Sequence, residues 1–151
     1  MQVQHVMTST VRTARQDDDL RSVASAICEL RISGMPVVDD ENRLIGIISE
    51  KDLLGALLPS YSDYLADPER GSDFETMESS YPELMSKKVG ELMATSVYTC
   101  SPDDPVLEAA SRMTSHHFRR LPVVDGENRL LGILSLSDIH QAIFKQTLAQ
   151  G

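Results

Sequence analysis

One internal repeat limits the possible folds of this chain more than any other feature of its sequence. Without a gap, residues 6–54 align with residues 92–140, an offset of 86 positions in a chain of 151 residues. The segment MPVVDDENRLIGIISEKDLL lies over LPVVDGENRLLGILSLSDIH, so Pro, Asp, Gly and Ser recur at equivalent positions. A solenoid needs several stacked repeats of a shorter unit. The sequence therefore predicts duplication of one small unit, giving a pseudo-two-fold pair.

Each copy is predicted to begin with an extended piece, at residues 10–13 or 96–99, that leads into a helix. Apolar residues recur along this helix at helical spacing, and aspartates stand at its start. In the second copy we expect Asp104 as the N-cap and Pro105 as the first helical residue, because both residue types are favoured there. Cys28 lies beside the apolar stripe of the first helix, so we expect it in the core.

Two short strands and a second helix complete each copy. The first copy has β-branched residues at 35–38 and 44–48, and the turn between them contains Asp and Asn residues typical of a hairpin. The equivalent strands of the second copy are predicted at 121–124 and 130–134. A serine then opens the last helix of each copy. The predicted order is strand, helix, strand, strand, helix, twice.

The sequence divides into a first copy at residues 1–54, an acidic segment at 55–90 and a second copy at 91–151, which together make one module. Of the formal net charge of −9, a share of −4 falls in the acidic segment. Prolines within this segment exclude one continuous helix, and its apolar residues predict partial ordering against the rest of the chain. We expect a spacer that is also a candidate flap facing a partner.

Charge and composition exclude several classes of protein. A net charge of −9, with no Trp, three Phe and four Tyr, argues against nucleic-acid binding through phosphates or stacked bases. No apolar run approaches the ~18 residues of a membrane span, and the N-terminus lacks the apolar region of a secretory signal, so no membrane insertion is expected. Cys28 and Cys100 alone predict free thiols in a reducing cytoplasm. A small anion held by a local basic cluster stays compatible with this charge.

Signatures of catalysis are missing from the sequence. It contains no G-x-S-x-G, H-E-x-x-H, P-loop or G-x-G-x-x-G motif. His116 and His117 have no second pair of ligands at a spacing suited to a metal. We therefore expect no catalytic residue, no metal site and no enzyme.

The run xxPVVDxxxxxxGIxSxxD occurs twice and resembles a tandem pair of CBS (cystathionine β-synthase) domains, often called a Bateman module. The resemblance covers almost the whole chain outside 55–88 and the last few residues. It implies an α/β (α+β) fold of two β-α-β-β-α repeats, packed through their sheets in a pseudo-two-fold arrangement with two related clefts. It also implies a stand-alone CBS protein that forms a homodimer.

Binding residues of this family can be carried over where the motif matches. In the family, the Asp of S/T-x-x-D typically binds ribose hydroxyls, and the Ser or Thr three residues earlier lies near ribose or phosphate. The segment before the first helix and the residues flanking the PVVD strand hold adenine, and basic residues just before that strand reach phosphate. The matching positions are Thr13, Met35, Pro36, Ser49 and Asp52 in the first copy, and Thr99, Arg119, Arg120, Leu121, Pro122, Ser135 and Asp138 in the second.

Only the second copy carries the basic pair. Ser33 and Gly34 stand in the first copy where Arg119 and Arg120 stand in the second. A carboxylate can accept two ribose hydroxyls, but a phosphate beside it needs guanidinium groups nearby. A helix that starts at Ser135 adds unpaired N–H groups that favour an anion. For the first copy, a nucleoside-like ligand, an empty cleft, and a lone functional site in the second copy all stay open.

Each motif also has a purely structural interpretation. Ser49-x-x-Asp52 and Ser135-x-x-Asp138 fit a helix capping box. The prolines of the two PVVD runs fit the start of a strand. Residues 116–120 fit a solvated helix end, where basic side chains suit the helix dipole. Capping and ligand binding can coexist at the same Asp.

The expected function is a regulatory module that binds an adenosine-containing ligand and signals to an unidentified partner by conformational or dimer change. AMP, ADP and ATP are the expected ligands, with S-adenosylmethionine as a further candidate, and no cofactor is required. The alternative is a ligand-independent scaffold for dimerisation or interaction. The two hypotheses differ in whether an adenine compound binds.

Overall fold

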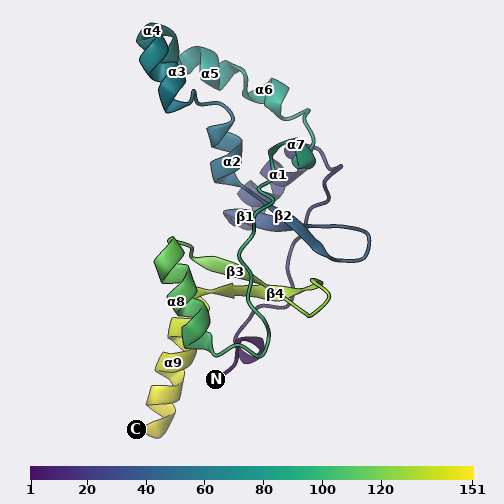
Figure 1. The fold of residues 1–151 in the computed structure, drawn as a ribbon, viewed down its shortest axis with the longest axis vertical. Helices are drawn as coiled ribbons and strands as arrows, with labels where there is room; N and C mark the ends of the chain where they lie inside the picture. Colours follow the sequence, from purple (N-terminus) through teal and green to yellow (C-terminus); the bar gives the residue numbers. More distant parts are fainter. The chain divides into compact units, whose positions relative to one another are not determined.

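The computed structural model describes residues 1–151, which form two compact units (Figure 1). Unit 1 consists of Met1–Arg12, Asp39–Leu44 and Ser96–Gly151, and unit 2 of Thr13–Val38 and Ile45–Thr95. Neither unit is continuous in the sequence, because unit 1 joins the second copy to pieces from the first third of the chain. The division of the sequence after residues 54 and 90 stays a prediction.

Unit 2 contains most of the first copy and the acidic segment. Its elements are α1 (Leu20–Leu30), β1 (Gly34–Val38), β2 (Leu44–Ser49), α2 (Glu50–Gly55), α3 (Tyr61–Ala66), α4 (Pro68–Gly71), α5 (Phe74–Ser79), α6 (Tyr81–Leu84) and α7 (Val89–Leu92). Strands β1 and β2 form a two-stranded sheet. The acidic segment is four short helices, α3 to α6, rather than one long helix, which confirms the prediction from its prolines.

Unit 1 contains the second copy and the first residues of the chain. Its elements are the 3-10 helix η1 (Val3–His5), α8 (Val106–His116), β3 (Arg120–Val124), β4 (Leu130–Ser135) and α9 (Leu136–Gln150). Strands β3 and β4 pair antiparallel, with Leu121 opposite Leu134. Both strands of this hairpin and both strands of the hairpin in unit 2 lie where the sequence predicts them.

The mixed helix and strand fold is therefore confirmed, with one difference at the start of each copy. Residues 10–13 and 96–99 form no strand, contrary to the prediction. Only the residue just after each piece pairs with the hairpin: Ala14 makes a single parallel bridge to β1, and Cys100 makes one to β3. A single bridge fixes the position of the chain beside the strand but does not extend the ladder.

The start of α8 also differs from the prediction. Pro105, rather than Asp104, is the N-cap, and the helix begins at Val106. The carboxylate of Asp104 instead accepts a hydrogen bond from the backbone N–H of Ser101 (2.9 Å), so it holds the turn before the helix. The backbone N–H of Val106 donates to the carbonyl of Met1 (3.0 Å). The carbonyl of a residue far away in sequence therefore accepts the hydrogen bond from this N–H, in the place of a capping side chain.

Helix α1 begins in the same way. The N–H of Leu20 donates to the carbonyl of Lys87 (2.9 Å), and the N-cap Asp19 makes no side-chain capping bond. Lys88 Nζ donates to Asp19 Oδ1 (2.7 Å), and this hydrogen bond raises the pKa of Lys88. Because Met1 and Lys87 are 86 positions apart, the same backbone capping occurs in both units.

The structural repeat therefore extends upstream of the region that aligns in sequence. Val3 donates through its N–H to the carbonyl of Asp104, and Val89 donates to the carbonyl of Asp18, both at 2.9 Å. Val3 and Val89 are both fully buried. The piece of chain that precedes each copy thus packs on the first helix of the other copy. This exchange explains why each unit is assembled from separate stretches of sequence.

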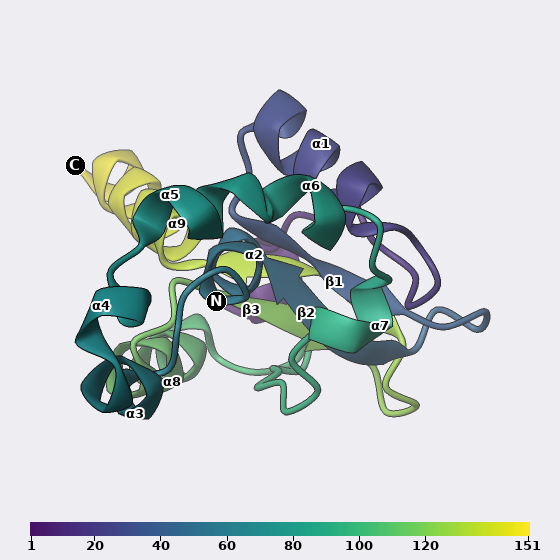
Figure 2. The same cartoon turned by 90° about the horizontal axis from the view of Figure 1, so that it is seen from above.

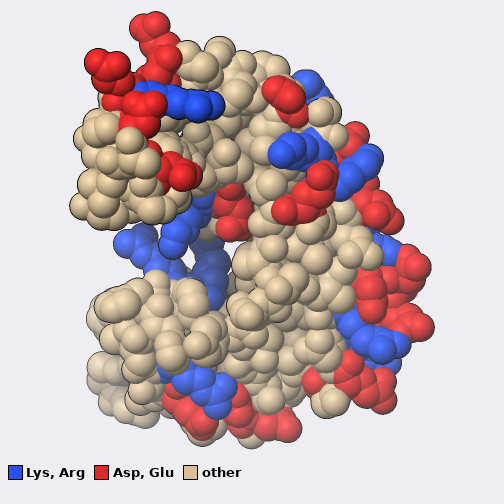
Figure 3. Space-filling model, turned by 45° about the horizontal axis from the view of Figure 1, so that its top comes forward, with Lys and Arg blue, Asp and Glu red and all other residues tan.

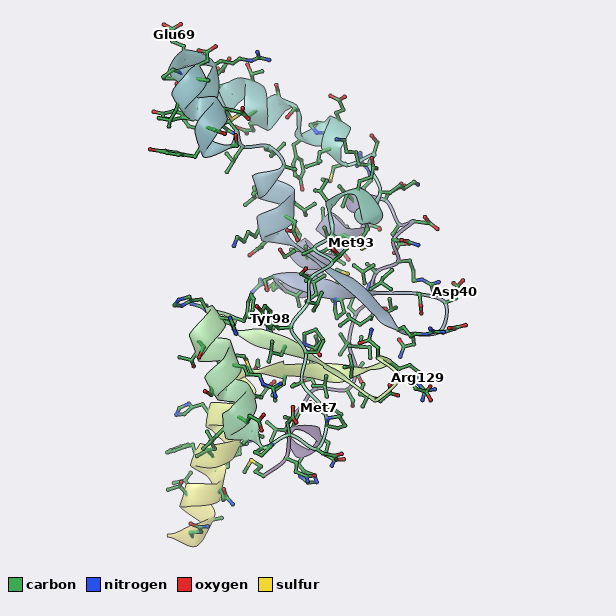
Figure 4. All side chains as sticks on the ribbon, in the orientation of Figure 1. Met7, Asp40, Glu69, Met93, Tyr98 and Arg129 are labelled. Carbon is green, nitrogen blue, oxygen red and sulfur yellow. The ribbon has the colours of Figure 1, made fainter.

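The same pieces continue across the second strand of each hairpin. Figure 2 shows α7 beside the β1–β2 sheet, and Figure 4 marks Met93, which follows it. A Cβ atom on Gly46 would lie 2.8 Å from the carbonyl oxygen of Ala94 and 2.9 Å from the Sδ of Met93. On Gly132 it would lie 2.6 Å from the carbonyl oxygen of Thr8. Glycine is therefore required at both positions so that the crossing backbone can approach the strand.

Each unit has its own cluster of buried apolar side chains. The cluster of unit 2 draws on α1, the hairpin, α2 and the segment after α5, and contains Ala14, Leu20, Val23, Ala26, Ile27, Met35, Val37, Ile48, Leu53, Leu84, Met85 and Val89. The cluster of unit 1 contains Val3, Cys100, Val106, Ala109, Met113, Leu121, Val123, Leu134 and Ile139. The prediction for Cys28 is wrong, because it is exposed. The buried face of α1 passes through Ala26 and Ile27 and leaves Cys28 outside it.

The turns of the two hairpins hold each other within unit 1. The N–H of Leu44 donates to the carbonyl of Asn128 (3.0 Å), and the N–H of Leu130 donates to the carbonyl of Asn42 (2.9 Å). The side-chain amides complete the exchange: Asn42 Nδ2 donates to the carbonyl of Leu130 and Asn128 Nδ2 to that of Leu44, both at 2.9 Å. Both asparagines have φ of 64°, a left-handed conformation that Asn tolerates better than most residues. We call these four hydrogen bonds the turn clasp.

An aspartate side chain stabilises each turn through further hydrogen bonds that are not part of the turn clasp. Asp125 accepts hydrogen bonds from the backbone N–H groups of Arg129 and Glu127, and one from the guanidinium of Arg129, each at 2.9 Å. The Arg129 backbone bond is the largest of the contributions that lower the pKa of Asp125. Asp39 makes the equivalent backbone bonds in the first hairpin. Figure 4 marks Asp40 and Arg129 on these two turns.

Removing one side-chain amide tests the turn clasp. We expect Asn42→Gly to lower the free energy of unfolding by about 1 kcal/mol, because the bond to the carbonyl of Leu130 is lost. Asn42→Ala should lower it by about 1–2 kcal/mol more, since Ala is strained at a left-handed φ. Urea unfolding followed by circular dichroism measures both. Equal stability of the Gly variant and the unmodified protein would show that the amide contributes nothing.

Candidate functional site

Strand pairing brings the basic pair of the second copy to the start of α9. Arg120 lies directly opposite Ser135 in the β3–β4 ladder. The N–H of Leu136, the first residue of α9, donates to the carbonyl of Arg119 (3.0 Å). Both arginines are exposed, and Ser135 is half-buried. Three predicted site positions from different parts of the motif therefore meet at one end of the hairpin.

Ser135 and Asp138 form a capping box at the N-terminus of α9. The N–H of Asp138 donates to Ser135 Oγ (3.0 Å), and the N–H of Ser135 donates to Asp138 Oδ2 (3.3 Å). The structural interpretation of this motif is thus confirmed. The box engages Oδ2, and an ionised carboxylate has further acceptor capacity on its other oxygen. Asp138 is half-buried.

Thr99 is held beside β3 from two sides. Cys100, the next residue, donates its N–H to the carbonyl of Pro122 (3.0 Å). Arg112 on α8 donates from Nη1 to the carbonyl of Thr99 (3.2 Å) and from Nη2 to Glu108 Oε1 (2.7 Å). Leu121 is also at this edge, and like Pro122 it is buried. The side chains of Leu121 and Pro122 are both buried, and their contact with a ligand stays a prediction.

An aromatic cluster that no sequence motif predicts flanks these residues. The ring of Tyr98 stacks on that of His116, with centroids 4.4 Å apart and planes inclined by 26°, and lies 5.3 Å from the ring of Phe118. Tyr98 and Phe118 are 50% and 40% exposed. Tyr98 precedes Thr99 and Phe118 precedes Arg119, and Figure 4 shows Tyr98 beside β3. No sequence pattern links Tyr98 to the end of α8, so only the fold reveals the cluster.

The predicted positions of the first copy come together in unit 2. Ser49 and Asp52 form a capping box on α2, with the N–H and the Oγ of Ser49 donating to Asp52 Oδ2 at 2.9 and 3.0 Å. Ala14, next to Thr13, donates its N–H to the carbonyl of Pro36 (2.9 Å). Thr13, Ser49 and Asp52 are half-buried, whereas Met35 and Pro36 are buried. The arrangement parallels that of the second copy but carries no basic pair.

A close backbone approach explains why the first copy cannot carry the second arginine. A Cβ atom on Gly34 would lie 2.6 Å from the carbonyl oxygen of Ile48 and 2.9 Å from the Cα of Ser49. Gly34 stands at the position equivalent to Arg120, and the N–H of Glu50 donates to the carbonyl of Ser33 (2.9 Å). Any side chain at residue 34 would push the two strands apart. The two candidate sites thus differ in charge for a steric reason.

Cys100, the buried cysteine beside β3, is not arranged for chemistry. Cys100 is 2% exposed, and burial raises the pKa of its thiol to about 11. Its Sγ lies 3.8 Å from the carbonyl oxygen of Pro122, which fits a weak S–H donor.

No three His, Cys, Asp or Glu side chains are grouped so that they could hold a metal ion. No helix of the structure combines the length and the apolar character that crossing a membrane requires.

The repeat, the hairpins and the two capping boxes together define the class of protein. The sequence model of the CBS domain family matches residues 3–59 and residues 89–145. These two matches cover most of the chain, so the protein belongs to the CBS domain family and contains two CBS domains. The matches begin at Val3 and Val89, the pair of buried valines that the structure makes equivalent.

Curated relatives include proteins of similar length and much longer ones. An uncharacterized protein of Methanocaldococcus jannaschii, MJ1426, is 32% identical over 139 residues, which cover 85% of this chain and 83% of the relative. The chain spans only 24% of a homoserine O-acetyltransferase from Methanococcoides burtonii, at 30% identity. Whatever those longer proteins do as a whole therefore carries no conclusion for this chain.

Solved structures share the fold along almost the whole chain. CBSX2 of Arabidopsis thaliana, in complex with AMP, matches with a TM-score of 0.74 and 27% identity over 97% of this chain and 98% of that one. The CBS domain pair of protein MJ0100, in complex with 5′-methylthioadenosine and S-adenosyl-L-methionine, matches with a TM-score of 0.68 over 97% and 98% of the two chains. At 23% identity the second likeness shows the fold alone.

The two thiols should differ in reactivity with an alkylating reagent. At pH 8, well below a pKa of about 11, Cys100 stays protonated and buried, whereas Cys28 is exposed. We expect iodoacetamide to modify the native protein once, at Cys28, and twice after unfolding in urea. Mass spectrometry of Cys28→Ser and Cys100→Ser variants assigns each adduct. Rapid native modification of Cys100 would contradict the placement of this segment against β3.

Proposed function

We propose that this protein is a regulatory module that binds an adenosine-containing phosphate ligand at the start of α9 in unit 1. The observation that carries the proposal is the meeting of Arg119 and Arg120 with Ser135 and Asp138 at one end of the β3–β4 hairpin. Two guanidinium groups beside the N-terminus of a 15-residue helix favour an anion. The carboxylate of Asp138 suits neutral hydroxyl donors such as those of ribose.

The surroundings of this cluster fit the remaining part of such a ligand. Thr99 and the backbone of Leu121 and Pro122 supply the edge where the family holds adenine, and Tyr98 and Phe118 expose aromatic surface beside it. A purine base can stack on such a surface. The net charge of −9 does not oppose this, because a local guanidinium pair decides the potential at short range.

The basic pair favours a phosphate-bearing ligand over an uncharged one. Guanidinium groups match phosphate geometry, and 5′-methylthioadenosine carries no phosphate that they could bind. We therefore propose AMP, ADP or ATP for the site in unit 1, which the AMP complex of the related CBSX2 supports. For the first copy, whose Gly34 leaves no room for an arginine, we propose a nucleoside-type ligand or an empty site.

A ligand-independent scaffold is the second candidate function. Both capping boxes are complete without a ligand, so neither helix start needs one for stability. Phe144 and Leu148 of α9 are 55% and 63% exposed, as an unpartnered interface would be. A homodimer formed through this helix would fit either function, and the regulated partner could read a change in that dimer.

Calorimetry with paired ligands tests the nucleotide site. We expect AMP to bind, and the double variant Arg119→Ala/Arg120→Ala to weaken AMP by at least about tenfold, because charge-assisted hydrogen bonds contribute about 1.5–3 kcal/mol. The same variant should leave the affinity for adenosine nearly unchanged. Asp138→Asn should weaken the binding of both AMP and adenosine. The amide oxygen can still cap the helix, but an NH2 donor then replaces the second carboxylate oxygen that would accept from ribose.

Lys145→Ala is the matched control, because it removes one positive charge from α9 seven residues beyond Asp138, whereas both arginines lie outside this helix. It should bind AMP as the unmodified protein does. No binding of AMP, ADP, ATP or S-adenosylmethionine up to millimolar concentration would overturn the proposal and favour the scaffold. Equal loss of AMP and adenosine in the arginine variant would contradict the phosphate assignment.

A further inference from the structure

The acidic segment of unit 2 exposes large apolar side chains that a core would normally bury. Tyr61, Leu65 and Phe74 are 76%, 60% and 61% exposed. Tyr64 and Leu58 nearby are 41% and 55% exposed. Single exposed apolar residues need no explanation, but several within one short stretch mark an interaction surface. Exposed tyrosine and phenylalanine are also residue types that interfaces favour.

These side chains are presented by helices with well-defined ends. Tyr61 and Leu65 are four residues apart on α3, so they lie on the same face of that helix. Ser60 caps α3 by accepting from the N–H of Asp63 (3.1 Å). Helix α4 packs closely on α3, because a Cβ atom on Gly71 would lie 3.0 Å from the Cα of Tyr64. The apolar face is therefore a fixed surface rather than the outside of a loose loop.

Negative charge surrounds this face. Residues 56–80 contain six carboxylates and one basic residue, Arg70. The carboxylates are Asp63, Asp67, Glu69, Asp73, Glu75 and Glu78. None of the ion pairs of the structure involves one of them. Figure 3 shows acidic side chains gathered at this end of unit 2 beside uncharged surface, and Figure 4 marks Glu69 there.

We propose that the exposed face of α3 to α5 is a docking surface for a basic amphipathic helix of a partner protein. A helix with apolar residues along one side would cover exposed apolar side chains of α3 and α5, and Lys or Arg along its flanks would meet carboxylates that form no ion pair. This names the class of partner for the proposed regulatory function. The chemistry of the surface does not depend on whether a nucleotide binds.

The charge of the surface disfavours the other occupants of an apolar face. A second copy of the chain would bring an equally acidic face against it, and like charges across an interface are unfavourable. Anionic lipid and nucleic acid would be repelled for the same reason. A basic partner alone turns both the apolar residues and the carboxylates into favourable contacts.

A designed peptide of about 18 residues tests the surface, with Leu and Phe at helical spacing on one side and Lys on the other. We expect fluorescence anisotropy to show micromolar binding that weakens as salt rises from ~0.05 to ~0.5 M. A scrambled peptide of the same composition should bind about tenfold more weakly, because it cannot place its apolar residues on one face.

The variant Tyr61→Ser/Leu65→Ser/Phe74→Ser should weaken the patterned peptide by at least about tenfold, as loss of central apolar contacts does. The matched control is Leu30→Ser/Leu107→Ser, which removes exposed apolar residues that lie outside α3 to α5 and should change nothing. Circular dichroism checks folding. Should the triple variant fail to fold, Glu69→Gln/Glu75→Gln/Glu78→Gln should weaken binding and flatten its salt dependence.

Equal binding of patterned and scrambled peptides, or unchanged binding by the triple variant, overturns the proposal. A dimer that dissociates in the triple variant assigns the face to a second copy, and binding to phosphatidylglycerol vesicles assigns it to a membrane; both also overturn it. Measuring with and without AMP separates this test from that of the nucleotide site. Peptide binding by a protein that binds no AMP would sustain the docking surface and overturn the proposed ligand.

Discussion

The antiparallel pairing of β3 with β4 is the constraint on which the candidate site depends. Because the register sets Arg120 opposite Ser135, the basic pair and the first turn of α9 share one end of the hairpin. A shift of one residue would turn Arg120 toward the other face of the sheet, since side chains alternate along a strand. Burial of Leu121 and Leu134, which face each other in the same ladder, opposes such a shift.

The repeat allowed the sequence to predict much of this arrangement. The internal alignment placed both hairpins and both serine-opened helices, because a duplicated unit must repeat its turns and caps. The twelve candidate site positions came from the family resemblance, and their contact with a ligand stays a prediction. The helix starts were harder. The N–H of Val106 is satisfied by Met1, and that of Leu20 by Lys87, so the capping groups lie far away in sequence and carry no side-chain signal. Local propensity favoured Asp104 where tertiary contact decided otherwise.

Other features escaped prediction for physical reasons of the same kind. A strand needs a partner along its length, and residues 10–13 and 96–99 meet the hairpins only through the residue that follows them. Cys28 is the residue after the buried Ile27 of α1, and hydrophobic periodicity does not locate the edge of a buried helix face to within one residue. The cluster of Tyr98, His116 and Phe118 depends on a contact between two segments that share no motif. Charge and turn patterns carry no information about such contacts.

Divergence between the copies is concentrated where the backbone allows it. At this end of the first hairpin, Gly34 lies so close to Ser49 that its position has no room for a side chain. The equivalent position of the second hairpin carries Arg120, opposite Ser135. Beyond the capping box, α2 stops after six residues and the acidic helices follow, whereas α9 continues for fifteen. The duplicated unit thus keeps its core and changes its edges, and the proposed nucleotide site belongs to unit 1 whereas the proposed docking surface belongs to unit 2.

The exchange of leading pieces between the units has a consequence for the order in which the chain can fold during synthesis. Unit 2 ends at Thr95, so all of its contacts can form before the second copy leaves the ribosome. Unit 1 needs Met1–Arg12, which are synthesised before unit 2, together with Ser96–Gly151, which are synthesised after it. The piece Met1–Arg12, with its buried Val3, therefore stays without its contacts in unit 1 while about a hundred further residues are synthesised. At ordinary rates of translation this interval lasts several seconds. The polar residues on both sides of Val3 suit a segment that stays unpaired for that time.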